Sequence, residues 1–180
     1  LSFSSVAVRG SFVYRTRPEE NYGLCRHGIG EKQGELFAYP GAGESIAPPA
    51  LLKNHIVYGG LDGALDVVPL DASSPPFAYR TAFGKSIVAP VAVADGNVVF
   101  GCEDGYLYVL SPEGDASPPK KDLNLNQIRS PLTSPLSDSA YNWKTSFGDF
   151  DNANANDHGV ETPFELRWIR RYDGTVKHFS

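Results

Sequence analysis

The sequence predicts an all-β fold built from about three tandem copies of a four-stranded antiparallel sheet. The main observation is a glycine-centred phrase that occurs twice, as HIVYGGLDGALDVV at 55–68 and as NVVFGCEDGYLYVL at 97–110. The chain also contains 18 Gly and 14 Pro, which favour many short strands and turns, and it has no capped helical stripe. Because one such repeat cannot bury its own apolar surface, neighbouring copies are expected to stack.

The second and third copies align almost residue for residue. Upstream of the phrase, Ser45 and Ser86 match at a spacing of 41, and the one-residue slip falls in a turn. The residues that match at a spacing of 42 are Val57 and Val99, Gly59 and Gly101, Asp62 and Asp104, Gly63 and Gly105, and Leu65 and Leu107. The repeats are therefore expected at about 1–44, 45–86 and 87–115.

The first copy is looser than the other two. Residues 6–14 align with 50–58, and residues 34–39 align with 63–68, which makes 34–39 the expected third strand of this unit. The segment left between them, about Thr16 to Gln33, is interpreted as an insertion at the edge of the sheet.

Strand and turn signals are clearest in the third copy. Tyr106, Tyr108 and Leu110 alternate with Leu107 and Val109, so both faces of this strand are apolar, as expected for a sheet between two others. The pairs Asp95-Gly96 and Asp104-Gly105 are typical of two-residue hairpin turns, because Gly accepts positive φ without a steric clash.

This order of strands and Asp-Gly turns, with its closing LYVL, resembles the β-propeller repeat of pyrroloquinoline-quinone (PQQ) enzymes and of the outer-membrane assembly lipoprotein with the same fold. The segment from Leu70-Asp71 to Tyr79 follows the family layout, with Tyr79 where the family places a docking Trp and Pro75-Pro76 in place of the usual Thr-Gly. The resemblance covers about residues 5–115. It implies a partial β-propeller of about three four-stranded antiparallel blades.

After residue 115 the composition changes. Residues 116–140 are rich in Pro and Ser and predict a linker, and 141–180 predict an Asn-rich aromatic loop followed by the start of a further blade, with Trp168 as a packed anchor. Three blades are fewer than the four to eight of a typical propeller, and the chain begins at Leu1 and lacks Met. These features predict that the remainder of a longer chain exists.

The Asn-rich loop also raises the possibility of a calcium site. Its weak candidate ligands are Asp149, Asp151, Asn154 and Asp157. The EF-hand pattern needs alternating ligands, a central Gly and a closing Glu, and no starting point in this loop supplies all three. An ordered loop without metal is therefore predicted.

No catalytic residue is predicted. Cys25 and Cys102 lie in different repeats and are expected to be free thiols, although a pairing stays open. Cys25 and His27 form a conceivable nucleophile and base, but such close neighbours in sequence seldom have the required geometry. Arg167, Arg170 and Arg171 surround Trp168 without forming one basic face. With a net charge of −5, nucleic acid is not expected as a partner, and no run of 18 apolar residues predicts a membrane span.

Three functions remain open. The first is a non-catalytic scaffold in the cell envelope, periplasmic or otherwise extracytoplasmic, that binds a protein through its blade edges or loops. The second is a fragment of a PQQ-dependent dehydrogenase that oxidises alcohols or sugars; only this alternative implies PQQ and calcium as cofactors. It needs a calcium-binding Glu-Asn-Asp set, an Asp base and a Trp platform, none of which can be placed. The third is a purely structural module of a large extracytoplasmic protein.

Overall fold

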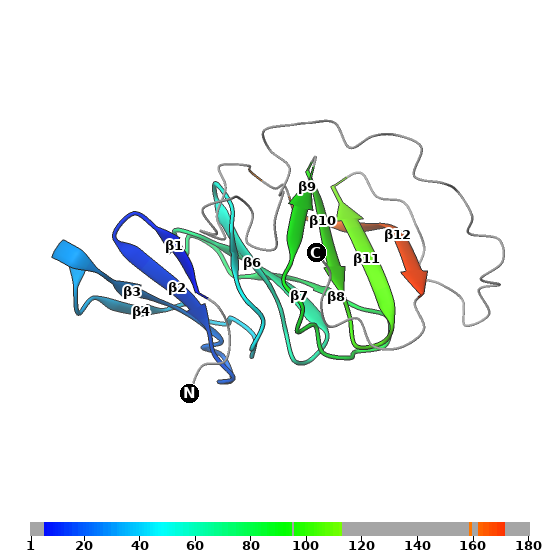
Figure 1. Cartoon of the computed structure of the whole chain (residues 1–180), viewed down its shortest axis with the longest axis horizontal. Coiled ribbons are helices and arrows are strands. Elements are labelled where there is room, and N and C mark those ends of the chain that lie inside the picture. Colours follow the sequence, from blue (N-terminus) through cyan, green and yellow to red (C-terminus); the bar gives the residue numbers. More distant parts are fainter. Residues whose placement is uncertain (1–5, 95, 113–158, 160–161, 172–180) are drawn as a thin grey trace.

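The computed structural model describes residues 6–94, 96–112, 159 and 162–171. These residues form three four-stranded antiparallel sheets that lie side by side in chain order, which confirms the predicted all-β class (Figure 1). The one helical element among them is a short 3-10 turn, η1 (Gly30–Lys32). No helix in this part of the chain has the length and hydropathy needed to cross a bilayer.

Sheet 1 holds the first four strands in sequential order: β1 (Ala7–Arg9), β2 (Phe12–Thr16), β3 (Leu24–Gly28) and β4 (Leu36–Ala38). The interpretation of Thr16 to Gln33 as an insertion was wrong, because this segment contains β3. Residues 34–39 accordingly supply the fourth strand and not the third. The strand was not predicted because its sequence, LCRHG, contains the polar residues Arg26 and His27 and so lacks the apolar run found at 106–110.

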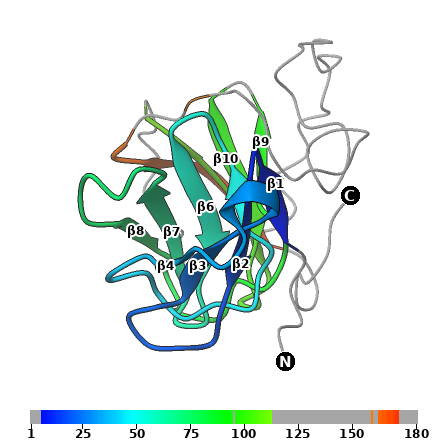
Figure 2. The same cartoon turned by 90° about the vertical axis from the view of Figure 1, so that its left-hand side faces the viewer.

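Sheet 2 is the central sheet. It consists of β5 (Ala50–Leu51), β6 (His55–Gly59), β7 (Ala64–Pro69) and β8 (Phe77–Arg80), again in sequential order. All six residues of β7 are buried. A strand that is buried on both faces needs a neighbouring layer on each side, and sheets 1 and 3 provide these layers, as the view along the stack shows (Figure 2).

Sheet 3 takes its last strand from far along the chain. After β9 (Ala92–Ala94), β10 (Asn97–Gly101) and β11 (Tyr106–Ser111), the fourth strand is β12 (Glu165–Arg171), which pairs antiparallel with β11. This corrects the expectation that the strand around Trp168 begins a further blade. The backbone of Trp168 lies opposite Val109 within sheet 3, and a register shift follows between Val109 and Leu110.

Two apolar clusters fill the spaces between the sheets. Between sheets 1 and 2 the buried side chains include Tyr14, Leu24 and Tyr39 from one side and Ile56 and Tyr58 from the other. Between sheets 2 and 3 they include Val57, Leu65 and Val67 against Phe100, Tyr108 and Leu110, with Leu166 of β12. Alternate residues of β6 and β7 therefore point to opposite neighbours, as the period of a strand requires.

The turn that defines the repeat has the same hydrogen bonds in sheets 2 and 3. The amide of Gly60 donates to the carbonyl of Ala64 at 2.7 Å, and that of Cys102 donates to Tyr106 at 2.9 Å. Each loop therefore holds three residues and is not the expected two-residue turn. Gly63 and Gly105 have φ values of 79° and 86°, so a glycine ends each loop in the left-handed region.

Gly59 is required for a different reason from Gly63 and Gly105, which is the close approach of the next segment. A Cβ at this position would lie 2.3 Å from the carbonyl oxygen of Ile87, too close for any other residue. The side chain of Ser45 donates to the carbonyl of Gly59 at 2.6 Å and fixes the other side of this strand end.

Candidate functional site

An open cleft of about 600 Å³ lies between sheets 1 and 2. Sheet 1 contributes Tyr14 and Arg26 from its central strands. Sheet 2 contributes the turn between β5 and β6 with the first residue of β6, residues 53–55, and the end of β7 with the loop that follows it, residues 69–74. The volume is within the range of small-molecule and peptide-side-chain sites. We take this cleft as the candidate functional site.

The strand register explains why Tyr14 and Arg26 reach the cleft together. Tyr14 of β2 lies opposite Arg26 of β3, which in turn lies opposite Phe37 of β4. Cross-strand neighbours share one face of a sheet, and Tyr14 and Phe37 belong to the cluster that packs on sheet 2. The row therefore presents Arg26 to sheet 2.

Hydrogen bonds between the sheets hold the two walls in place. A guanidinium nitrogen of Arg9 donates to the carbonyl of Leu52 at 2.7 Å, directly before the turn at Lys53. The hydroxyl of Tyr39 donates to the carbonyl of Leu70 at 3.0 Å. Both bonds join a side chain of sheet 1 to backbone of sheet 2, so the width of the cleft is fixed from both ends.

The two loops of sheet 2 are also tied to each other. The amide of Leu70 donates to the carbonyl of Asn54 at 3.0 Å. Next to it, the carboxylate of Asp71 accepts the amide of Ser73 at 3.0 Å in an Asx turn. The hydrogen bonds from Ser73 lower the pKa of Asp71, so this carboxyl is ionised at neutral pH. Asp71, singled out from the repeat pattern, thus supports the rim of the cleft.

Arg26 is the most constrained side chain of the cleft. Its guanidinium carbon lies 4.7 Å from the ring centroid of Phe12 and 5.0 Å from that of Phe37. One terminal nitrogen reaches the carboxylate of Glu35 at 3.5 Å. Its Nε is nevertheless buried and has no hydrogen-bond partner among the described residues. A buried unpaired donor costs about 1–3 kcal/mol, so this atom calls for an acceptor.

His55 presents a second buried polar atom on the opposite wall. Its Nδ1 has no hydrogen-bond partner in the described part of the chain. Burial lowers the pKa of His55 below its usual value, against a smaller opposing effect of Asp71, so the ring is neutral at pH 7. Two residues that line the cleft, one from each sheet, therefore each have a buried nitrogen atom without a hydrogen-bond partner among the described residues.

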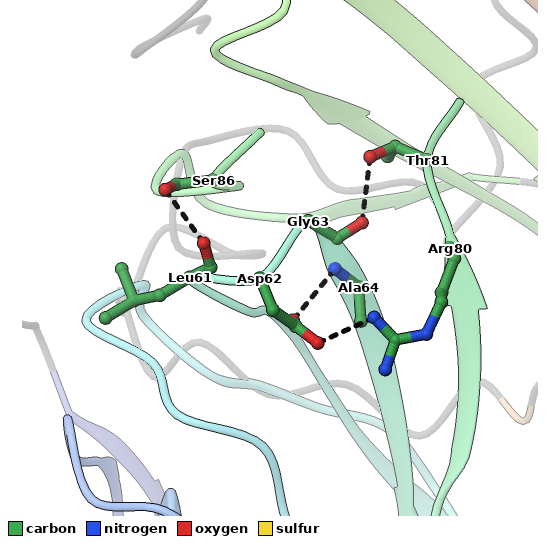
Figure 3. Close-up of polar contacts among 7 residues, drawn as sticks. All are labelled: Leu61, Asp62, Gly63, Ala64, Arg80, Thr81 and Ser86. Carbon is green, nitrogen blue, oxygen red and sulfur yellow. Dashed lines mark hydrogen bonds and ion pairs between the residues drawn. The ribbon is translucent and has the colours of Figure 1, made fainter. Parts of the chain in front are cut away.

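The repeat residues lie at the other end of sheet 2. Asp62 accepts the amide of Ala64 at 3.1 Å and an ion pair from Arg80 at 2.8 Å (Figure 3). The hydroxyl of Ser86 donates to Leu61 and that of Thr81 to Gly63, which joins the turn to the segment leading into sheet 3. These residues, with their counterparts around Gly101 and Asp104, build the fold and contribute nothing to the cleft.

Tyr79 and Trp168 were expected to act as packing anchors. Tyr79 is half-buried and packs against the cluster between sheets 2 and 3, where the removal of its hydroxyl from water raises its pKa. The backbone of Trp168 lies in β12 opposite Val109.

The pair of Cys25 and His27 lies on the face of sheet 1 that points away from sheet 2. Their side chains approach to 3.5 Å between Sγ and Nε2, because alternate residues of a strand share a face. The same Nε2 accepts a hydrogen bond from Arg15 at 3.0 Å. Burial and the charges of Arg15 and Arg17 lower the pKa of His27. This nitrogen is thus already engaged, and Cys25 is fully buried, which leaves the pair unsuited to nucleophilic chemistry.

Both cysteines are free and buried. The thiol of Cys102 donates to the carbonyl of Lys85 at 3.2 Å, and burial raises its pKa to about 12. A thiol in this state contributes to packing and does not react readily.

Within the described ranges no three His, Cys, Asp or Glu side chains come together to hold an ion. The weak calcium candidates Asp149, Asp151, Asn154 and Asp157, and the predicted linker at 116–140, lie outside these ranges.

The sequence matches neither a protein-family model nor a characterised protein.

Sequence reasoning did not find the residues of the cleft. Arg26 was assigned to an insertion, and His55 was noted only as the first residue of the repeated phrase at 55–68. The repeat alignment gives no clear signal, because Arg26 lies opposite Tyr14 as Asp66 lies opposite Tyr58, and His55 aligns with Asn97. The packing of sheet 1 against sheet 2, which brings these two residues to one cleft, has no counterpart in local sequence pattern.

Proposed function

We propose that this chain is a non-catalytic scaffold whose three sheets are consecutive blades of a β-propeller, and that it binds a protein partner through the cleft between sheets 1 and 2. The propeller interpretation is supported by the equivalent turns of sheets 2 and 3 and by the central sheet, which has neighbours on both faces. The resemblance of the repeat supports a location in the cell envelope.

The observation that carries the binding proposal is the preformed, polar and open character of the cleft. Its walls are joined by hydrogen bonds from Arg9 and Tyr39 to backbone of sheet 2, so little conformational freedom remains to be lost on binding. Rigid walls lined by loop side chains are common where scaffold domains contact partners.

Site-specific photo-crosslinking in the cells of origin tests this function. A photoreactive phenylalanine analogue at Ser74, an exposed residue of the cleft rim, is expected to yield a discrete adduct with one protein, identified by mass spectrometry. The matched control is the same analogue at Phe83, which is exposed at the opposite end of sheet 2 and stacks on Tyr106. Absence of an adduct at Ser74, or the same adducts at both positions, would refute the proposed surface.

The envelope location is tested separately by fractionation of the same cells. The chain is expected with the periplasmic or membrane-associated fraction. Recovery with a cytoplasmic marker would contradict the location and leave the cleft proposal standing.

A further inference from the structure

Two residues that line the cleft from opposite sheets, Arg26 and His55, indicate what kind of group it takes. Arg26 Nε comes from sheet 1 and His55 Nδ1 from sheet 2, and both are buried without a hydrogen-bond partner in the described residues. Buried polar groups in folded proteins are nearly always satisfied by protein, water or ligand. A guanidinium N–H can only donate, so the missing partner of Arg26 is an acceptor, such as an oxygen.

Arg26 is also held ready for such a partner. The rings of Phe12 and Phe37 lie 4.7 and 5.0 Å from its guanidinium carbon, and both belong to the apolar packing between the sheets. A guanidinium confined in this way loses little rotamer entropy when it binds, and its planar fork of donors matches the two oxygens of a carboxylate.

The charges around the cleft favour a single negative charge on the ligand. Among the lining side chains Arg26 and Lys53 are cationic and Asp71 is anionic, while His55 is neutral at pH 7. The sum over these side chains is one positive charge in a chain whose net charge is −5, and the ion pair of Arg26 with Glu35 lowers the charge that a ligand meets. A dianionic phosphate would be repelled by Asp71 more strongly than a singly charged carboxylate.

We propose that the cleft binds a carboxylate-bearing segment of a partner protein, with Arg26 as the anchoring cation and His55 as a second hydrogen-bonding group. This assignment rests on the proposed function and adds the chemistry of the partner. The open cleft of about 600 Å³ accommodates an extended peptide with an acidic side chain turned toward Arg26. The polar side chains of Asn54, Ser73 and Ser74 lie along the route of its backbone.

The test is a titration of the full 180-residue chain followed by amide NMR. The probes are an acetylated and amidated peptide, Gly-Ser-Glu-Ser-Gly, its Gln isostere, and inorganic phosphate. The Glu peptide is expected to shift the amides of the cleft loops and to bind about tenfold more tightly than the Gln peptide, as a charge-assisted hydrogen-bonded pair requires. Equal binding of the two peptides, or tighter binding of phosphate at the same amides, would overturn the carboxylate assignment.

Variants connect the effect to Arg26. Arg26→Gln is expected to lower affinity for the Glu peptide about tenfold, with Arg26→Lys in between because it keeps the charge and loses the fork. Arg80→Gln is the matched control, since Arg80 is an exposed arginine at the far end of sheet 2. Unchanged binding by Arg26→Gln, or an equal loss in Arg80→Gln, refutes the role of Arg26.

A third variant covers the case in which Arg26 substitutions fail to fold. Lys53→Gln changes an exposed side chain at the rim. It should lower the affinity for the Glu peptide roughly threefold without changing the affinity for the Gln peptide. An unchanged ratio between the two peptides contradicts the proposal. If the crosslink at Ser74 forms while the peptides bind equally, the protein-binding function stands and only the carboxylate chemistry falls.

Discussion

Between sheets 2 and 3, Phe100 and Tyr108 stack with their ring centroids 5.1 Å apart and their planes nearly parallel. The positions 42 residues earlier, which face the space between sheets 1 and 2, are Tyr58 and Asp66. One interface thus has two buried aromatic rings where the other has one ring and a buried carboxyl group. The interface with the carboxyl group also contains the cleft.

The difference extends to the turn that both repeats share. Tyr108 donates its hydroxyl to Asp104 at 2.6 Å, so a buried ring fixes this turn from inside. The equivalent Asp62 is held by Arg80 from outside, in an ion pair whose side chains are 52% and 69% exposed. Asp66 Oδ2 lies buried without a partner among the described residues. We infer that the interface between sheets 2 and 3 is optimised for packing, whereas the interface between sheets 1 and 2 retains polar groups at some cost in stability.

The largest effect is expected from Tyr108→Ala. Removal of a fully buried aromatic side chain should lower the free energy of unfolding by about 3–5 kcal/mol, because it deletes contacts and leaves a cavity. Urea denaturation followed by circular dichroism measures this. Tyr108→Phe is the control that keeps the ring and loses only the bond to Asp104, with an expected cost of about 1–2 kcal/mol. Equal costs for the two variants would show that the ring does not matter.

The second effect concerns pH. Burial, helped by the charge of Asp62 and opposed by Arg80, raises the pKa of Asp66 to about 7 from its usual 3.8. Folding therefore favours the protonated form, and the resulting stability is complete below about pH 4 and is lost as pH rises through 7. Relative to Asp66→Asn, the free energy of unfolding of the native chain should fall by about 2–4 kcal/mol between pH 4 and pH 8.

Urea denaturation at several pH values measures this difference. Parallel stability curves for the native chain and Asp66→Asn would contradict the buried-carboxyl interpretation. Asp71→Asn is the control: this exposed carboxyl has a lowered pKa, so its contribution is present at neutral pH and disappears only under acidic conditions. It should leave the slope between pH 5 and pH 8 unchanged.

The smallest effect is expected from Arg80→Gln. The ion pair with Asp62 is exposed, and such pairs contribute between 0 and about 1 kcal/mol. A change of less than about 0.5 kcal/mol in urea denaturation, reduced further by added salt, is expected. A loss comparable to that of Tyr108→Phe would show that the two turns are held equally firmly, and the proposed contrast between the interfaces would fail.

The repeats could be predicted because turn chemistry is local. Gly63 and Gly105 predict the loops from sequence alone, and both have positive φ in the structure. The alternation of 106–110 indicates a strand buried on both faces. Strand β3 could not be found in this way, because Arg26 and His27 interrupt the apolar pattern. The pairing between β11 and β12 was missed for another reason. No local signal in the sequence states which distant segment completes a sheet.

The cleft also needed information from residues that are distant in sequence. Its walls meet because Arg9 and Tyr39 reach backbone atoms of the next repeat, and these contacts join residues 31 to 43 positions apart. The sequence does announce the polarity of Arg26 and His55. It does not indicate that the two would line one cleft.

The late arrival of β12 has a consequence for how the molecule assembles. Sheets 1 and 2 are each complete within a short stretch of chain, whereas Ser111 and Glu165, which pair in sheet 3, are separated by the intervening residues 112–164. Closing so long a loop carries a larger entropic penalty and tends to slow folding. During synthesis the amino-terminal pair of sheets can therefore form first, while the edge of β11 stays open to wrong pairing until its partner has left the ribosome.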